Sequence, residues 1–291
     1  MFNKVHARIE NLKDNLLSEK GLNLDVLRLD EIDPVISGNK LFKLWYYLEE
    51  AETTNKKIIT FGGAYSNHLA ATAIACSERG IPATGIVRGE RPPDLSHTLK
   101  FCMSKGMELI FISREEYDKK KVIEEKNDSS ILIPEGGYGL QGTAGASLIN
   151  SFYDATSYTH ICTSVGTGTT LAGIIRKNET CYLGFSALKN LTDFKERIDR
   201  LRPEETFNNY KIINDYSFGG YAKKDKALLS FMNDFYTKFN IPTDFVYTGK
   251  MFFGVWDMIS NNYFSKGSKL LCLHTGGLQG NLSLAYGSLE F

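Results

Sequence analysis

Short apolar runs rich in β-branched residues alternate along the chain with longer stretches whose apolar residues recur every three or four positions. The short runs predict β-strands and the longer stretches predict helices. The predicted strands are residues 58–61, 83–87, 109–112, 131–133, 158–165, 182–186, 211–214 and 269–274. The predicted helices are 69–79, 95–105, 140–153, 170–177, 224–239 and 252–263, with another between 186 and 211. This alternation predicts parallel βαβ units and an α/β fold whose sheets are flanked by helices.

The length and composition are those of a globular protein. The chain has 291 residues, of which 42% are hydrophobic and 23% are charged, so we expect one large domain or two small ones. The formal net charge is +0, from 34 basic and 34 acidic residues. Because no excess of positive charge is available to neutralise phosphates, nucleic acid is not an expected partner.

The cysteines and the apolar segments exclude several other classes. The count of five cysteines is odd and no CxxC pair occurs, so neither a disulfide framework nor a metal site is expected. The sequence begins MFNKVHARIE, without the apolar core of a signal peptide. No apolar stretch has the length of a membrane span. We therefore expect a cytoplasmic protein without a membrane contact.

Glycine clusters fall where predicted strands lead into helices, which is where open α/β sheets bind ligands. The first cluster is Ser37-Gly38-Asn39-Lys40, ahead of an apolar-periodic stretch beginning at Leu41. Lys40 would then lie at a helix N-terminus, where the helix dipole disfavours a cation and lowers its pKa. An imine-forming lysine needs such a lowered pKa. The alternative is an ordinary exposed lysine in the first turn.

Two further clusters are suited to bind anions. Gly62-Gly63 is followed by Ser66 and Asn67, and the free N–H groups at the start of the next helix can hold a carboxylate. Helix capping by Ser66 and Asn67 is the simpler explanation. The segment Gly166–Thr170 follows a predicted strand and opens a helix, which makes a phosphate site plausible. It matches neither a Walker motif nor the complete dinucleotide fingerprint.

The last two segments lie near the C-terminus. His274-Thr275-Gly276-Gly277 ends the final predicted strand, and Val246-Tyr247-Thr248-Gly249-Lys250 lies upstream of it. Tyrosine is usually structural. A tyrosine before Thr-Gly at a strand end is also a candidate acid or base.

Together and in this order, the segments SGNKLFKL, GGAYSNH, VGTGTTLAG, VYTGK and HTGGLQG resemble the 1-aminocyclopropane-1-carboxylate deaminase / D-cysteine desulfhydrase family. This family belongs to the pyridoxal-phosphate (PLP) enzymes of the tryptophan-synthase-β type, known as fold type II. The resemblance extends from Gly38 to Gly280. It implies two open, twisted, mainly parallel sheets flanked by helices. It also implies a large domain of residues 1–44 plus 151–291, a small domain of residues 45–150, PLP between them, and a homodimer.

The resemblance also implies a role for each matching residue. Lys40 would carry the cofactor, and Asn67 would hydrogen-bond its 3′ oxygen. Ser66 would act near the carboxylate and Cα of the substrate, and Tyr247 would abstract or relay a proton. The residues implied to bind cofactor are Lys40, Asn67, Gly166, Thr167, Gly168, Thr169, Thr170, and Thr248 or Thr275 at the pyridine nitrogen. The residues implied to bind substrate are Ser66, Asn67, His68 and Tyr221.

Thr248 favours one reaction over another. In family members that open the cyclopropane ring, an acidic residue typically follows the tyrosine and contacts the pyridine nitrogen. A threonine hydroxyl does not stabilise a protonated pyridine as a carboxylate does, so the cofactor should be a weaker electron sink. This favours α,β-elimination of D-cysteine or a related small amino acid to pyruvate, ammonia and sulfide. The alternatives are deamination of the cyclopropane amino acid to 2-oxobutanoate and ammonia, and a PLP-holding module without turnover.

Overall fold

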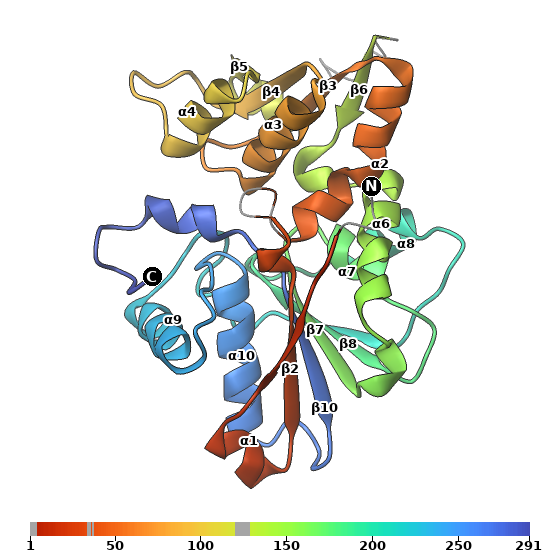
Figure 1. The fold of residues 1–291 in the computed structure, drawn as a ribbon, viewed down its shortest axis with the longest axis vertical. Coiled ribbons are helices and arrows are strands. Elements are labelled where there is room, and N and C mark those ends of the chain that lie inside the picture. The colour runs from red at the N-terminus through yellow and green to blue at the C-terminus, as the bar shows by residue number, and fades with distance from the viewer. Residues whose placement is uncertain (1–4, 34–35, 37, 120–128) are drawn as a thin grey trace.

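The structure is a computed structural model that describes residues 5–33, 36, 38–119 and 129–291. Ser37, one of the residues in the first glycine cluster, lies outside the described residues. Two separate sheets organise the fold (Figure 1). The larger has the strand order β1-β2-β10-β7-β8-β9, and the smaller has the order β5-β4-β3-β6.

The large sheet is parallel except for the antiparallel pair β1–β2. Its strands are β1 (Ile9–Leu12), β2 (Asn23–Arg28), β7 (His160–Val165), β8 (Cys181–Ser186), β9 (Tyr210–Ile213) and β10 (Lys269–His274). Alternate residues of β10 enter different cores, with Leu270 and Cys272 in one and Leu271 and Leu273 in the other. Both faces of this sheet are therefore covered, as its continuous apolar strands require.

Different helices cover the two faces of the large sheet. The core on one face includes side chains of α1 (Asn15–Lys20), α9 (Lys226–Phe239) and α10 (Thr248–Ser260). The core on the other includes side chains of α7 (Thr169–Ile174) and α8 (Phe194–Leu201). Beside α7 lies α6 (Leu140–Ser147), continued by the 3-10 segment η4 (Leu148–Phe152).

The small sheet is fully parallel. It consists of β3 (Lys57–Gly62), β4 (Ala83–Arg88), β5 (Glu108–Ile112) and β6 (Ser130–Ile133). Side chains of α3 (Asn67–Arg79) and α4 (His97–Ser104) form its main core. Tyr117 of α5 (Arg114–Lys119) packs with Phe61 and Ile86 in a separate cluster.

Helix α2 (Asn39–Thr54) joins the two parts of the molecule. Phe42 near its start packs in a core of the large sheet, whereas Leu44, Leu48 and Ala51 pack in the core of the small sheet. The predicted boundary between residues 44 and 45 falls inside this helix. All four strands of the small sheet lie within residues 45–150, and the exact domain limits stay a prediction.

The structure confirms the predicted α/β architecture and corrects several of its details. The sequence patterns did not predict β1, β2, α1 or α5. The helix predicted over 140–153 ends at Ser147 and continues as a 3-10 segment. The helix predicted over 252–263 begins earlier, at Thr248, because the Asp244 carboxylate accepts hydrogen bonds from the backbone at its start.

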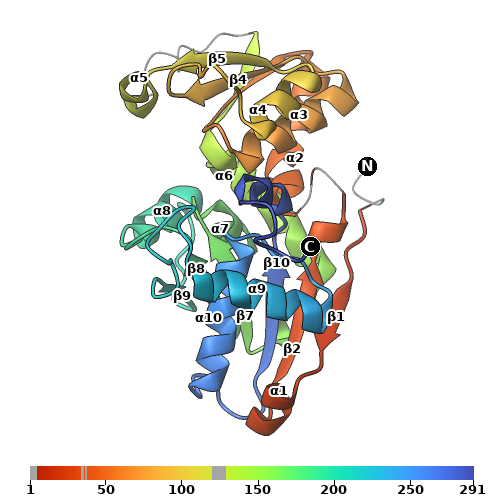
Figure 2. The same cartoon turned by 90° about the vertical axis from the view of Figure 1, so that its left-hand side faces the viewer.

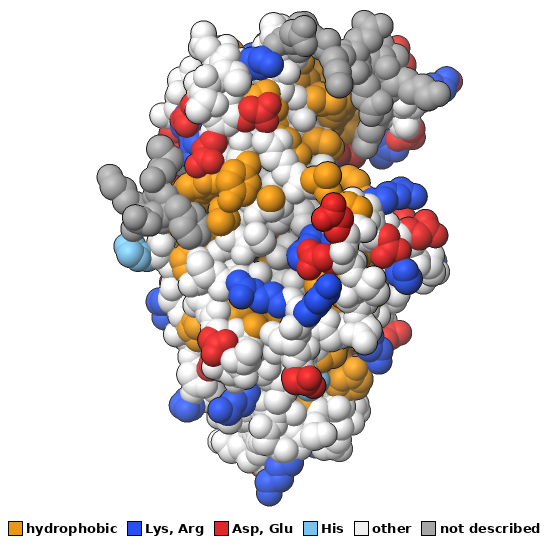
Figure 3. Space-filling view, turned by 90° about the vertical axis from the view of Figure 1, so that its right-hand side faces the viewer, with side chains coloured by type: hydrophobic (Ala, Val, Ile, Leu, Met, Phe, Trp, Pro, Cys, Tyr) orange, Lys and Arg blue, Asp and Glu red, His pale blue; other side chains and the backbone are white. Residues whose placement is uncertain are grey.

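The described part of the surface mixes charges of both signs on the face that Figure 3 draws. None of the described helices is both long and apolar enough to cross a membrane. The described residues also contain no group of three or more His, Cys, Asp or Glu side chains placed to hold a metal ion.

Candidate active site

Loops from the two sheets meet between them. The Nδ2 atom of Asn67, after β3, donates to the carbonyl oxygen of Gly277, after β10, over 3.2 Å. A Cβ atom placed on Gly136, after β6, would lie 3.0 Å from the Cγ2 atom of Thr167, after β7. These loops all follow the carboxyl ends of parallel strands, where α/β proteins bind ligands. Their junction is therefore the candidate active site.

Gly38 brings the first turn of α2 into this junction. Its φ of 70° and ψ of −146° favour glycine, and a Cβ there would lie 1.8 Å from the carbonyl oxygen of Thr275. The same carbonyl accepts the N–H group of Asn39 over 3.3 Å. The Nδ2 atom of Asn39 donates to Thr170 Oγ1 over 2.8 Å. The backbone before Lys40 is thus attached to the turns after β10 and β7.

Lys40 lies at the start of α2, as predicted. Its Nζ atom donates to Asn39 Oδ1 over 3.0 Å and lies 5.9 Å from the centre of the Tyr247 ring. Burial lowers the pKa of this ammonium group to about 8, against a smaller opposing attraction from Asp244. A lysine with such a pKa has a substantial neutral fraction near neutral pH, which nucleophilic chemistry requires.

Ser66 and Asn67 both lie at the start of α3. The Ser66 hydroxyl accepts from the N–H group of Leu69 over 3.2 Å, so it does cap the helix. Asn67 Nδ2 bonds to Gly277, whereas its buried Oδ1 atom has no hydrogen-bond partner among the described residues. Since buried polar atoms are normally paired, the Asn67 amide is positioned to receive a polar ligand.

His68 is directed toward the small sheet. Its Nε2 atom lies 2.9 Å from Thr60 Oγ1, and that hydroxyl donates to the carbonyl of Ile133 over 2.9 Å. Thr60 therefore accepts, so the Nε2 atom of His68 carries the hydrogen. Burial, with the charges of Lys43 and Lys40, lowers the pKa of His68 well below its ordinary value. The neutral ring is a structural contact of the small sheet, and the predicted substrate contact through His68 stays untested.

The loop after β7 has the predicted strand–glycine–helix form. Gly168 has a φ of 93°, and a Cβ there would lie 2.7 Å from Cε2 of Phe194. A Cβ on Gly166 would lie 3.1 Å from Cε1 of Tyr247. The Thr167 and Thr169 hydroxyls are 3.0 Å apart. The first N–H groups of α7 have no partners within the helix, so the loop presents hydroxyl and amide donors toward the junction.

Lys43 is a site residue that the sequence analysis missed. It lies one turn after Lys40, is 4% exposed, and among the described residues has neither a hydrogen-bond acceptor nor a carboxylate partner. Burial, together with Lys40, lowers its pKa well below the ordinary value. A Cβ on Gly137 would lie 3.5 Å from Lys43 Cε. A buried cation without an anion is costly, so this position fits an anionic ligand.

Tyr247 lies against Gly166 in the loop after β7 and near Lys40. Its ring packs edge-on against Tyr221 with 6.1 Å between ring centres. Burial raises the pKa of Tyr247 well above its ordinary value, and Tyr221, Asp244 and Glu135 add to the effect. The phenol therefore stays protonated at neutral pH and is suited to donate a proton.

Asp244 is a second residue that the sequence analysis missed. Its buried carboxylate accepts from the N–H groups of Val246, Tyr247 and Thr248 and from the Thr248 hydroxyl, over 2.8–2.9 Å. The Thr248 hydroxyl in turn accepts from the N–H group of Asp244 over 2.9 Å. Both the donor and an acceptor position of the Thr248 hydroxyl are thus engaged by Asp244 within this turn.

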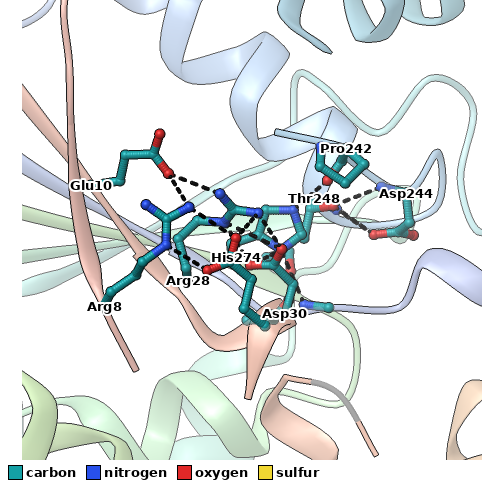
Figure 4. Close-up of polar contacts among 12 residues, drawn as sticks. Arg8, Glu10, Arg28, Asp30, Pro242, Asp244, Thr248 and His274 are labelled. Carbon is teal, nitrogen blue, oxygen red and sulfur yellow. Dashed lines mark hydrogen bonds and ion pairs between the residues drawn. The ribbon is translucent and has the colours of Figure 1, made fainter. Parts of the chain in front are cut away.

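Thr275 and His274 hold the turn after β10. The Thr275 hydroxyl lies 3.1 Å from Ser164 Oγ. His274 is fully buried, and its Nε2 atom donates to the carbonyl of Pro242 over 2.7 Å (Figure 4). Its Nδ1 atom lies 3.3 Å from the N atom of Gly276 and 3.2 Å from Asp30 Oδ1. The imidazole therefore fixes the glycine turn relative to the segment that carries Asp244.

An ion-pair network extends from Asp30 to the N-terminal strands. Arg28 pairs with Asp30 over 2.7 Å and with Glu10 over 2.8 Å (Figure 4). Arg8 pairs with Glu31 over 2.6 Å. Arg28 and Asp30 are buried. Removal of one partner from such a buried pair is strongly destabilising. Because Asp30 also contacts His274, this network helps to hold the turn of residues 274–277 in place.

Residues 14–276 match the family model described as pyridoxal-phosphate dependent enzyme. The chain belongs to this family. The predicted cofactor, PLP, and the predicted enzyme class are thereby confirmed.

Relatives with assigned names support the narrower resemblance. A protein of Thermotoga maritima named "Putative 1-aminocyclopropane-1-carboxylate deaminase" is 31% identical over 297 residues, covering 91% of this chain and 92% of its own. A protein of Arabidopsis thaliana named "Bifunctional D-cysteine desulfhydrase/1-aminocyclopropane-1-carboxylate deaminase, mitochondrial" is 28% identical, covering 89% of this chain and 73% of its own.

Solved structures agree with the predicted fold type II. A crystal structure of an ACC deaminase homologue superposes with a TM-score of 0.80 and 26% identity, covering 95% of this chain and 90% of that one. Threonine deaminase isoform 2 of Solanum lycopersicum, with a TM-score of 0.69 and 13% identity, covers 99% of this chain and 87% of that one. At that identity, the second match shows the fold alone.

The junction fits PLP. Lys40 is the neutral-prone amine that would bond to the cofactor's aldehyde carbon. The hydroxyl and amide donors of the loop after β7 would hold its phosphate. The Lys43 amine has no anionic partner among the described residues, and it would supply a matching positive charge once the phosphate favours its protonated form. Lys43 was within reach of sequence reasoning, because residues three apart share one face of a helix. The sequence pattern did not indicate the roles of Asp244 and His274. The partners of Asp244 lie in irregular backbone, and the partners of His274, Pro242 and Asp30, are distant in the sequence.

We predict that Lys43→Met weakens PLP binding by about 10- to 100-fold, because a charge-assisted hydrogen bond is worth about 1.5–3 kcal/mol. Absorbance titration of the apoprotein with PLP measures the dissociation constant. The melting temperature of the apoprotein should stay level or rise, since the buried amine that is removed has no polar partner among the described residues. An unchanged dissociation constant would exclude Lys43 from the cofactor site.

We predict that covalent capture of PLP by the apoprotein accelerates about tenfold per pH unit up to a midpoint near the Lys40 pKa of about 8, and then levels off. The sign follows from the lowered pKa: only the neutral amine reacts, and its fraction rises with pH until the group is deprotonated. Stopped-flow absorbance between pH 6 and 10.5 measures the rate. A rate that keeps rising through pH 10 would indicate an ordinary, solvated lysine.

Proposed function

We propose that this enzyme catalyses α,β-elimination of D-cysteine or a related small amino acid to pyruvate, ammonia and sulfide. The observation that carries the proposal is the turn at Thr248. This position does not supply a carboxylate, and the nearby Asp244 carboxylate is engaged by four hydrogen-bond donors. PLP, when bound, withdraws electrons from the substrate's Cα. Without an acidic partner at its ring nitrogen it does so less strongly, which suits a reaction whose leaving group takes the electrons away.

The pKa values of Lys40 and Tyr247 suit them to opposite roles. Lys40 has its pKa lowered to about 8 and can accept a proton from the substrate's Cα after the substrate's amine has displaced it. Tyr247 has its pKa raised well above the ordinary value and can donate a proton to the departing sulfur. Groups whose surroundings push their pKa values apart in this way form an acid–base pair.

The remaining roles follow the predicted assignments. Asn67 would bond to the cofactor's 3′ oxygen, and Ser66 with the first N–H groups of α3 would hold the substrate carboxylate. Gly166–Thr170 and Lys43 would hold the phosphate. Of the two threonines considered for the pyridine nitrogen, we propose Thr275, because the Thr248 hydroxyl both donates to and accepts from Asp244.

Deamination of 1-aminocyclopropane-1-carboxylate to 2-oxobutanoate and ammonia is the second candidate. The names of the Thermotoga maritima and Arabidopsis thaliana relatives favour it. The predicted homodimer also stays a proposal, since it rests on the family resemblance, and light scattering after size-exclusion chromatography tests it. The cytoplasmic location stays a prediction from the sequence.

Assays of the PLP-loaded protein separate these candidates. We expect sulfide and pyruvate from D-cysteine, with a smaller kcat/KM for 2-oxobutanoate release from the cyclopropane amino acid. Lys40→Ala should abolish both reactions and the absorbance band of lysine-bound PLP. Efficient ring opening by the wild type would contradict the argument from Thr248. If Lys40→Ala keeps both the absorbance band and the activity, the assignment of the site is wrong.

We predict that Tyr247→Phe keeps PLP bound while kcat falls by about 10²–10⁴, the usual contribution of a general acid. The aromatic ring that packs on Gly166 remains, and only the hydroxyl is lost. Absorbance reports the bound cofactor and sulfide release reports turnover. An unchanged rate would remove Tyr247 from the mechanism.

A further inference from the structure

Lys250 is a buried lysine outside the predicted site. It lies in the first turn of α10, three residues after Tyr247, and is 2% exposed. Its Nζ atom donates to the carbonyl oxygens of Ser217 over 2.8 Å and of Gly220 over 2.7 Å. Burial lowers its pKa to about 8, against an attraction from Asp244. The two neutral carbonyls are therefore its direct partners among the described residues.

The loop that Lys250 holds has an unfavourable backbone conformation. Phe218 and Ala222 have φ values of 52° and 54°, in the left-handed region that costs a residue with a Cβ about 1 kcal/mol or more. Gly219 and Gly220 also have positive φ values. The carbonyls of Ser217 and Gly220 each close a turn, by accepting from the N–H groups of Gly220 and Lys223. Lys250 thus bonds to both turns of a loop that does not favour this shape by itself.

This loop carries Tyr221 to Tyr247. Tyr221 is 53% exposed, so burial does little to fix its side chain. Its position depends on the loop backbone and on its edge-on contact with the Tyr247 ring. The Tyr247 ring, in turn, has Tyr221 as an aromatic neighbour, 6.1 Å away between ring centres. The position of the Tyr247 ring is therefore connected to the ammonium group of Lys250 through one short loop.

We propose that Lys250 is a positioning residue, whose ammonium group holds the loop 217–222 so that the ring of Tyr221 orients the ring of Tyr247. The proposal rests on the role of Tyr247 proposed above. Lys250 acts through Tyr221 and needs no contact with the substrate. A lysine that only stabilised the fold would lower the melting temperature without a specific effect on this loop or on the tyrosine pair.

Limited trypsin digestion of the PLP-loaded protein tests the first step. Lys223 and Lys224 are exposed and follow the loop directly. We expect Lys250→Met to accelerate cleavage after these two residues by about tenfold or more, as read by mass spectrometry. Lys250→Gln, which keeps two N–H donors, should restore part of the protection. The matched control is Lys195→Met, which removes an exposed lysine whose ion pair is with Asp199 on the surface. This variant should be cleaved after Lys223 and Lys224 at the wild-type rate.

A double-mutant cycle tests the second step. Lys250→Met and Tyr221→Ala should each lower kcat for sulfide release, because each disturbs the contact that positions the Tyr247 ring. The double variant should be no slower than the slower single variant, because both changes act on Tyr247. Losses that multiply would overturn the proposal, as would unchanged cleavage in Lys250→Met. If Lys250→Met fails to fold, the digestion and the double-mutant cycle are carried out on Lys250→Gln instead. If the wild type shows no turnover, the proposed function is refuted. The digestion then still tests whether Lys250 holds the loop 217–222.

Discussion

The contact between Gly38 and the carbonyl of Thr275 is the constraint on which the site depends. A side chain at residue 38 would collide with that oxygen, and the positive φ of Gly38 turns the chain directly into α2. Lys40 therefore enters the junction on backbone that is attached to β10 through Thr275 and to the loop after β7 through Asn39. Since α2 then continues into the core of the small sheet, one helix sets both the reactive amine and the relation of the two sheets.

Lys40, Lys43 and Lys250 have few counter-charges, and burial lowers the pKa of each. Lys40 and Lys250 are attracted by Asp244 without a direct ion pair, and Lys43 has no carboxylate partner among the described residues. Asp244 itself is used to start α10. Protonation of these amines is therefore unfavourable in the protein without its cofactor, and an anionic phosphate beside Lys43 would favour it. Cofactor affinity and the lowered lysine pKa values thus have a common origin in burial.

The sequence predicted the features that local patterns encode. Glycine clusters after apolar runs identified the loops at Gly62, Gly166 and Gly276, because tight turns at strand ends require glycine locally. The unpaired Lys43, the Asp244 turn and the His274–Asp30 contact depend on partners or burial that only the folded chain supplies. The helix dipole pointed to Lys40, whereas the cause that the structure resolves for its lowered pKa is burial. The strand β1 was missed because it is short and half-exposed.

The strand order of the large sheet has a consequence for how the protein forms during synthesis. The small sheet consists of strands that follow one another closely along the chain, so it can assemble once residue 133 has emerged from the ribosome. In the large sheet, Asn23 of β2 pairs with Lys269 of β10. The strand β2 therefore cannot complete its pairing until β10 has been synthesised. During most of translation its edge has unpaired backbone groups that can associate with other chains. The ion pairs among Arg8, Glu10 and Arg28 place charges on that waiting hairpin, which discourages such association.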